Sequence, residues 1–285
     1  MGIDLHIHTT ASDGDTTPLA VLRQAQSSGI SILSITDHES IDGFLAILDE
    51  ANRLDIQMLP GLELLTEYQG REVHLLGYLF DYSSACLVDR LTELRALRNQ
   101  AAFETIHNLR KHGFDLNSHN VAKLANGGIG AIGKNHIIQE LVNIGHIHSQ
   151  ADAVQILRQY LSRESKTYVE FNRHSLAEAQ ELIRTAGGIP VLAHPGILND
   201  DRMVEEIIRF YNLPGIEVYY AYFYNQIDLI LKFQRFAQER SLLATGGSDY
   251  HGKYAPVLLG AVKVPTYCYT QLIEYQNRTH EGDTE

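Results

Sequence analysis

The sequence of 285 residues is short of several features, and each absence narrows the class of protein. It has no Trp and only two Cys, Cys86 and Cys268, which are too few for a disulfide framework and have no close-spaced partner for a Cys-based zinc site. No apolar run reaches the length of about eighteen residues that a transmembrane helix needs. The N-terminus lacks the basic segment and apolar stretch of a signal peptide. We therefore expect free thiols, no membrane association and a cytoplasmic location.

Positive charge is also scarce, since 23 Lys and Arg stand against 35 Asp and Glu, for a formal net charge of -12. Binding of a long nucleic acid depends on many Lys and Arg contacts to phosphates, so this composition argues against it. A small phosphorylated substrate remains compatible, because bound metal ions would add positive charge that the formal count omits. No apolar stripe stands out in the sequence as a subunit interface, and we expect a monomer.

The distribution of apolar residues predicts an α/β fold in three segments. Over residues 1–83, short β-branched runs alternate with helical stretches. Residues 84–165 change to helical periodicity, with Leu87, Leu91 and Leu94 at three- and four-residue spacing. Strand signals return over residues 166–285. We predict a β/α barrel whose two parts, 1–83 and 166–285, are separated by an all-helical insertion subdomain, 84–165.

Local signals predict where individual elements begin. Thr17 and Pro18 are typical of a helix start, Gly29 of its end, and Ser175 with Glu178 of a capping box. Further helices are predicted over residues 40–54 and 225–238. The predicted strands cover residues 3–7, 31–36, 56–64, 73–79, 168–171, 189–193, 215–220, 242–245 and 261–264.

Side chains that can bind metal ions gather where these predicted strands end. His6 and His8 lie two residues apart, so the strand period of two directs both imidazoles to the same side. A single histidine at a strand end more often packs as a hydrogen-bonded structural residue. Here, however, other strand ends or the loops just beyond them supply the same chemistry: Asp13, His38, Glu63, His74, His194, Asp249 and His251. Because active sites of β/α barrels assemble at the carboxyl ends of the strands, we predict a metal site there.

These segments resemble the PHP (polymerase and histidinol phosphatase) superfamily. The resemblance rests on Asp4-Leu5-His6-Ile7-His8, Thr36-Asp37-His38, Gly61-Leu62-Glu63, His74, Ala193-His194-Pro195-Gly196 and Gly247-Ser248-Asp249-Tyr250-His251. It implies a distorted seven-stranded, TIM-like β/α barrel, with a helical insertion where the periodicity changes. It is nearest to the branch of nucleoside 3',5'-bisphosphate phosphatases and 5'-end-directed oligoribonucleotide hydrolases.

The resemblance also implies how two or three divalent ions would be held. The first would be bound by His6, His8, Glu63 and Asp249, the second by Glu63, His74 and His194, and the third by Asp13, His38 and His251. Imidazole and carboxylate ligands suit Mn, Fe and Zn alike.

The implied activity is hydrolysis of a phosphomonoester on a small phosphorylated metabolite, by attack of a metal-bound hydroxide. The predicted catalytic residues are His194, His251 and Asp249, and either His194, His251 or a metal-bound water would protonate the leaving group. Two alternatives stay open. One is a cyclic sugar phosphate or histidinol phosphate hydrolase on the same metal site, and the other is a non-catalytic module that binds metal or a polymerase partner.

Two smaller predictions concern residues beside the metal ligands. The family usually carries Gly-Arg-Pro-His where this chain has Gly133-Lys134-Asn135-His136, so Lys134 and His136 are predicted to bind substrate. Lys134 keeps the positive charge but lacks the planar fork that binds phosphate in two places. Asp4 and Asp37 either orient imidazoles of the ligands or cap loops.

Overall fold

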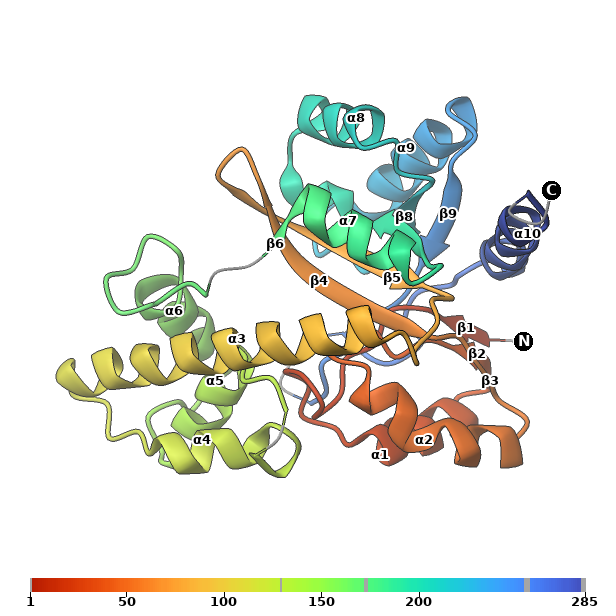
Figure 1. Cartoon of the computed structure of the whole chain (residues 1–285). Coiled ribbons are helices and arrows are strands. Elements are labelled where there is room, and N and C mark those ends of the chain that lie inside the picture. The colour runs from red at the N-terminus through yellow and green to blue at the C-terminus, as the bar shows by residue number, and fades with distance from the viewer. Residues whose placement is uncertain (1, 129, 172–173, 254–256, 283–285) are drawn as a thin grey trace.

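The computed structural model describes residues 2–128, 130–171, 174–253 and 257–282, which form an α/β fold (Figure 1). The strands are β1 (Gly2–Asp4), β2 (Ile30–Leu33), β3 (Gln57–Met58), β4 (Gly61–Tyr68), β5 (Arg71–Tyr78), β6 (His174–Ser175), β7 (Ile189–Leu192), β8 (Gly215–Tyr219) and β9 (Leu243–Gly246). The helices are α1 (Pro18–Ser27), α2 (Asp42–Arg53), α3 (Ala85–Lys111), α4 (Ser118–Leu124), α5 (Lys134–Asn143), α6 (Gln150–Tyr160), α7 (Leu176–Thr185), α8 (Asp201–Phe210), α9 (Gln226–Glu239) and α10 (Thr266–Gly282), with short 3-10 turns η1 (Asn126–Gly128) and η2 (Pro195–Leu198).

The described strands form two sheets rather than the closed seven-stranded barrel that was predicted. A three-stranded parallel sheet has the order β1-β2-β3, and a six-stranded mixed sheet has the order β6-β4-β5-β7-β8-β9. The pairs β4–β5 and β5–β7 are antiparallel. Isolated bridges between Ile7 and Tyr250 and between His38 and Glu63 join the sheets. Regular strand pairing ends near these bridges, where the segments that carry His6, His8 and His38 leave the strand conformation. The predicted closed barrel is therefore not confirmed.

Local helix signals are confirmed where the chain supplies its own caps. The Thr17 hydroxyl accepts a hydrogen bond from Ala20 N ahead of Pro18, and α1 begins there as predicted. Ser175 and Glu178 form the reciprocal capping box that starts α7. These caps satisfy backbone donors that would otherwise lack partners at the helix start.

Two predicted strands are wrong. Residues 168–171 form no strand, because Val169 N donates to the hydroxyl of Thr105 on α3 instead of to a neighbouring strand. Residues 261–264 also form none, although Val262 and Val264 are buried in the main core. In both cases the alternation of apolar residues reflects packing against other elements rather than strand pairing.

Helix α3 joins two large apolar clusters, and its Ala101 lies between them in a small third cluster. Its first half contributes Leu87, Leu91 and Leu94 to the main core beneath the six-stranded sheet. Its second half contributes Ile106 and Leu109 to a separate cluster formed with α4, α5 and α6. Figure 1 shows α3 running from the sheet to this helical group. The segment division at residues 83 and 165 stays a prediction, and α3 crosses from one cluster to the other.

The described helices include none that is long and apolar enough to span a bilayer.

A buried ion pair ties α3 to the first part of the chain and gives a prediction for stability. The guanidinium of Arg98 contacts the carboxylate of Glu39, whose other oxygen accepts from Leu65 N, and both side chains are buried. Removing one partner of a buried pair leaves an uncompensated charge, which costs about 3–5 kcal/mol. We expect Arg98→Met to lower the free energy of unfolding in urea by that amount.

The matched control is Arg95→Met on the same helix, whose ion pair with Asp42 is more exposed. That variant should lose about 1 kcal/mol or less. Equal losses of unfolding free energy in the two variants would show that the Arg98–Glu39 pair contributes no more to stability than a more exposed pair.

Candidate metal centre

Two neighbouring segments bring the first group of side chains together. Asp249 N donates to His6 O at 2.8 Å and His8 N to Tyr250 O at 2.8 Å, so the segment after β1 lies beside the segment after β9. A side chain at Gly247 would place a Cβ only 2.3 Å from His6 N, which explains why this close approach requires glycine. As a result, Asp249 Oδ1 lies 3.2 Å from His6 Nε2 and 3.1 Å from His8 Nε2.

The buried carboxylate of Glu63 is the centre of the whole cluster. It lies at the start of β4, next to the bridge with His38. Five imidazoles have a nitrogen 2.9–3.4 Å from one of its two oxygens: His6, His8, His38, His74 and His194. Burial alone would raise the pKa of Glu63, but His38, His74 and His6 lower that pKa well below its ordinary value.

Asp13 forms the other end of the cluster. Its Oδ1 lies 3.3 Å from His251 Nε2, 3.7 Å from His8 Nδ1 and 3.9 Å from His38 Nε2. Burial opposes ionisation of this carboxyl, but His251 and His38 hold its pKa well below the usual range. The carboxylate is therefore available as an anionic ligand.

The structure brings all nine predicted ligands into one cluster, within which three groups have ligand atoms within 4.8 Å of one another. The group His6, His8, Glu63 and Asp249 matches the predicted set. The group His8, Asp13, His38 and His251 adds His8 to the predicted third set, and the group His38, Glu63 and His74 takes His38 where His194 was expected. His194 nevertheless has Nε2 at 3.2 Å from Glu63 Oε1.

The nitrogen and oxygen atoms of the cluster are placed to bind cations rather than to form hydrogen bonds with one another. His6 Nε2 and His8 Nε2 lie 3.2 Å apart, both turned toward carboxylate oxygens. Within the described residues, the buried atoms His38 Nδ1 and Asp13 Oδ1 make no hydrogen bond. Imidazole and carboxylate donors at such spacing are those that divalent transition metals prefer.

Glu217 is a residue of this centre that the sequence analysis missed. It is buried on β8, where Oε1 lies 3.0 Å from His6 Nδ1 and Oε2 accepts from His194 N at 2.7 Å. A carboxylate on the outer ring nitrogen fixes which nitrogen of His6 faces inward. Its position two residues into a short apolar strand, Gly-Ile-Glu-Val-Tyr, was the available signal.

Asp4 and Asp37 follow the loop-capping alternative. Asp4 accepts from the backbone N–H groups of His6, Ser248 and Gly260. Asp37 accepts from the backbone and hydroxyl of Thr9 and from the Ser12 hydroxyl. Burial raises the pKa of both carboxyls, and these hydrogen bonds oppose the rise. Both residues therefore hold the loops that carry the ligands.

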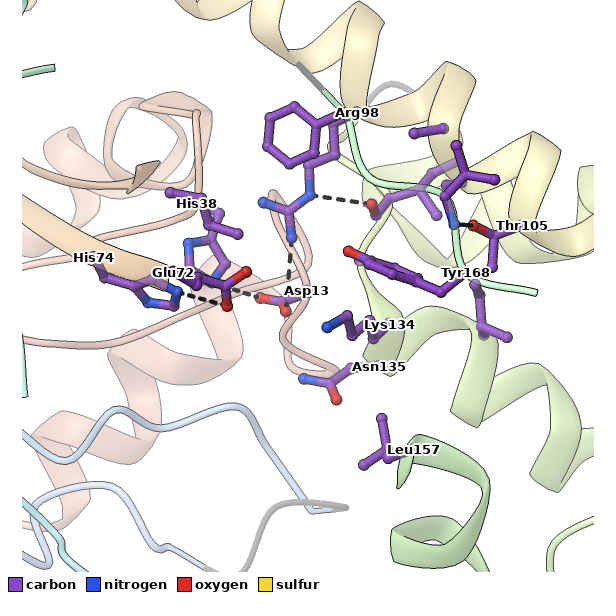
Figure 2. A pocket seen from close by; sticks show the side chains of 18 residues that line it. Asp13, His38, Glu72, His74, Arg98, Thr105, Lys134, Asn135, Leu157 and Tyr168 are labelled. Atoms are coloured by element: carbon purple, nitrogen blue, oxygen red, sulfur yellow. Dashed lines mark hydrogen bonds and ion pairs between the residues drawn. The ribbon is translucent and has the colours of Figure 1, made fainter. Parts of the chain in front are cut away.

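A cavity of about 190 Å³ opens beside the cluster, between the sheets and the helical group. Figure 2 shows His38, Glu72 and His74 on one side, Lys134 and Tyr168 on the other, and Asp13 between them. Its apolar wall comes from Leu65, Ala101, Ala102, Ile132, Ile137, Leu157, Val169 and Phe171. The cavity thus joins a polar floor to an apolar wall, as ligand sites commonly do.

The predicted substrate-binding residues lie at the start of α5. Lys134 lines the cavity, with Nζ 4.4 Å from the centre of the Tyr168 ring. His136 is fully buried behind it and does not line the cavity, and its Nδ1 accepts from Gly133 N at 3.0 Å. Arg98, which the sequence analysis did not single out, lies 3.8 Å from Asp13 Oδ2 and lines the same cavity.

Comparison with known proteins identifies the family. The PHP domain profile matches residues 4–174. The chain belongs to the PHP domain family. A 5'-3' exoribonuclease of Haemophilus influenzae is 31% identical over 253 residues, covering 87% of this chain and 89% of the relative. A 3',5'-nucleoside bisphosphate phosphatase of Chromobacterium violaceum is 30% identical over 259 residues, covering 87% of each chain.

Solved structures agree with this PHP assignment. An amidohydrolase from Chromobacterium violaceum, solved with bound sulfate and no metal, superposes with a TM-score of 0.83 at 27% identity, over 97% of both chains. A protein from Bifidobacterium adolescentis assigned as a metal-dependent phosphoesterase gives 0.85 at 26% identity, over 96% of both chains. The PHP chain thus shares its fold with these proteins along nearly its full length.

Glu63 belongs to two of the three groups of possible metal ligands, and this gives a prediction for metal content. Glu63→Gln keeps the shape but removes the negative charge that faces five imidazoles, so we expect the purified variant to hold at least one metal ion fewer per chain. Elemental analysis by mass spectrometry measures this directly.

The control variant is Glu67→Gln on the same strand, whose side chain is 44% exposed and pairs with Arg163. It should retain the wild-type metal content. If Glu63→Gln also retained it, Glu63 would not be a metal ligand.

Proposed function

We propose that this PHP-family hydrolase of phosphoester bonds acts on a nucleoside 3',5'-bisphosphate or on a short 5'-phosphorylated oligoribonucleotide. The proposal rests above all on the cluster around Glu63, whose members Asp13, His38 and His74 line a cavity that has Lys134 on its other side and Arg98 beside Asp13. Phosphatase and exoribonuclease names among the relatives support the same reaction class.

Two or three divalent ions would be held by the nine clustered residues. Three ions bring a charge of about +6, and the carboxylates of Asp13, Glu63 and Asp249 return about -3, so a phosphate group is a natural ligand of the centre. The mixed imidazole and carboxylate donors suit Mn, Fe or Zn. When bound, such ions would activate a water for attack and neutralise charge on the phosphoryl oxygens.

The residues of the chain hold the reacting groups in place. The backbone of His194 is fixed by Glu217, and Asp249 accepts from the Tyr220 hydroxyl at 2.8 Å. Either His194 or His251 can deliver a proton to the leaving oxygen, since both side chains are less than one-fifth exposed at the edge of the cluster. Asp249 contributes by holding its carboxylate between His6 and His8.

The size of the cavity and its apolar wall favour a nucleotide over a phosphate ester that has no base. At about 190 Å³ it is smaller than the roughly 300–1,000 Å³ of pockets that enclose drug-sized ligands. It therefore suits one base or sugar, with a phosphate of the same nucleotide beside Lys134 at the N-terminus of α5. The N–H groups at that helix start favour an anion.

Other members of the family keep an alternative in view. A phosphoribosyl 1,2-cyclic phosphate 1,2-diphosphodiesterase of Eggerthella lenta is 26% identical over 92% of this chain, so a cyclic sugar phosphate is a second candidate substrate. A monomeric state and a cytoplasmic location, expected from the sequence, remain predictions.

Substrate choice is tested by phosphate release with Mn present. The panel is adenosine 3',5'-bisphosphate, AMP, histidinol phosphate, a cyclic ribose phosphate and a 5'-phosphorylated RNA, the last followed by product analysis. We expect turnover of the bisphosphate and the RNA, lost in Asp13→Ala because that variant removes a carboxylate of the cluster. Turnover of the cyclic phosphate alone would move the substrate to the alternative, and no turnover of any would support a non-catalytic module.

Lys134 can be tested separately from the metal centre. Lys134→Ala should lower kcat/KM for the bisphosphate by about 10- to 100-fold, the size expected for a lost hydrogen bond to a charged group. Lys134→Arg should keep most of the activity, since its fork also binds phosphate. Lys123→Ala, on the exposed face of α4, is the control. Equal activity of Lys134→Ala and Lys123→Ala would remove Lys134 from the substrate site.

A further inference from the structure

A second cavity borders another part of the metal centre. It has a volume of about 420 Å³ and shares Glu72 and His74 with the first cavity. Whereas the first touches Asp13 and His38, the second touches His194 and Asp249. The cluster therefore borders two cavities, and a phosphate bound there can carry one substituent into each.

A series of aromatic rings leads outward on the side of the second cavity. The ring of Tyr220 lies 5.2 Å from that of His194 and 4.8 Å from that of Tyr222. The next two residues, Phe223 and Tyr224, are 68% and 85% exposed. Large aromatic rings in such exposed positions, next to an active site, call for a ligand that covers them.

Tyr222 links these rings to the rim of the cavity. Its hydroxyl accepts from Gly196 N at 3.1 Å, in turn η2, and a Cβ at Gly196 would lie 2.5 Å from its ring. The following residue, Ile197, lines the second cavity and is 56% exposed. Tyr222 thus connects the rim of the second cavity to the chain segment that carries Phe223 and Tyr224.

The second cavity also contains guanidinium groups. Arg71 contacts Asp200 at 3.4 Å and donates to Leu198 O, and both arginines line the cavity. Arg163 is held more firmly, because it contacts Glu67 at 2.6 Å, pairs with Glu170 and donates to Gly70 O at 2.7 Å. The Arg71–Asp200 pair is more than two-fifths exposed on each side. Because exposed ion pairs are weak, Arg71 can turn from Asp200 to a phosphate.

We propose that the second cavity and the pair Phe223–Tyr224 form a binding surface for the downstream part of a single-stranded oligonucleotide. Bases would stack on the two exposed rings, which suits any sequence because every base has a flat face. Arg71 would face the phosphates of the strand. This inference rests on the proposed function and selects the oligonucleotide as the larger substrate.

The same chemistry then serves both substrates. The base or sugar of the first nucleotide would occupy the first cavity, and its 3'-phosphorus would lie at the predicted metal centre. A water oxygen bonds to that phosphorus, the bond to the 3'-oxygen breaks, and the 3'-oxygen takes up a proton. The products are a nucleoside 5'-phosphate and either inorganic phosphate or a strand shortened by one nucleotide, which keeps the attacked phosphorus as its new 5'-phosphate.

The experiment compares the double variant Phe223→Ala/Tyr224→Ala with wild type on two substrates. These are adenosine 3',5'-bisphosphate and a 5'-phosphorylated RNA hexamer. We expect the ratio of kcat/KM for the hexamer to kcat/KM for the bisphosphate to fall by about 10-fold or more, the effect of losing stacking with at least one base. Phe210→Ala, a 77% exposed aromatic at the far end of α8 from η2, should keep the wild-type ratio.

A binding measurement keeps the test independent of turnover. With metals chelated, fluorescence anisotropy of 3'-labelled hexamer should show about 10-fold weaker binding to the double variant than to wild type. An unchanged ratio and unchanged binding would overturn the proposal. So would light scattering that shows a wild-type dimer split by the double variant, because the rings would then be covered by a second copy. If wild type hydrolysed neither substrate but bound the hexamer through these rings, the proposed function would fail while the surface stood.

Discussion

The structure depends on the balance of charge around one buried carboxylate. Glu63 is nearly inaccessible, and five imidazoles stand within 3.4 Å of its oxygens. An isolated carboxylate would be too costly to bury, and so many imidazoles would repel one another if each were protonated. Cations bound between the carboxylates and imidazoles would remove both problems and would allow loops from both sheets to converge on one point.

The backbone is irregular at the same place. His194, Asp249 and Glu39 have φ values of 25°, 53° and 47°, a region that side chains other than Gly, Asn and Asp seldom occupy. Such conformations cost free energy and persist only where the surroundings impose them. Here the surroundings are the hydrogen bonds of Glu217 to His194 N and of Tyr220 to Asp249, together with the ion pair of Glu39. The backbone therefore departs from regular strand conformation at the positions where the predicted ligands require other φ values.

Much of this arrangement was predictable from sequence because the responsible signals are local. Three local signals each determine the geometry of only a few residues. They are the two-residue spacing of His6 and His8, the Thr17 cap, and the ligand-type side chains at strand ends. Long-range pairing was not predictable in the same way. The alternating run at residues 168–171 looks like a strand, yet it forms the cavity wall because Thr105, more than sixty residues away, takes its backbone N–H. Glu217 and Arg98 were missed for a similar reason, since each acquires its role from partners distant in sequence.

The course of α3 through both apolar clusters has an evolutionary consequence. The predicted metal ligands all come from outside the helical group, whereas Lys134, Ile137 and Leu157, which line the first cavity, come from within it. Substitutions in α5 and α6 can therefore reshape what the cavity accepts without disturbing the predicted ligands. Because α3 is packed at both ends, the reshaped wall stays at a fixed distance from the metals. The predicted metal ligands and the residues that select the substrate therefore lie in different parts of the chain. Related proteins can diverge in substrate while they keep the same reaction centre.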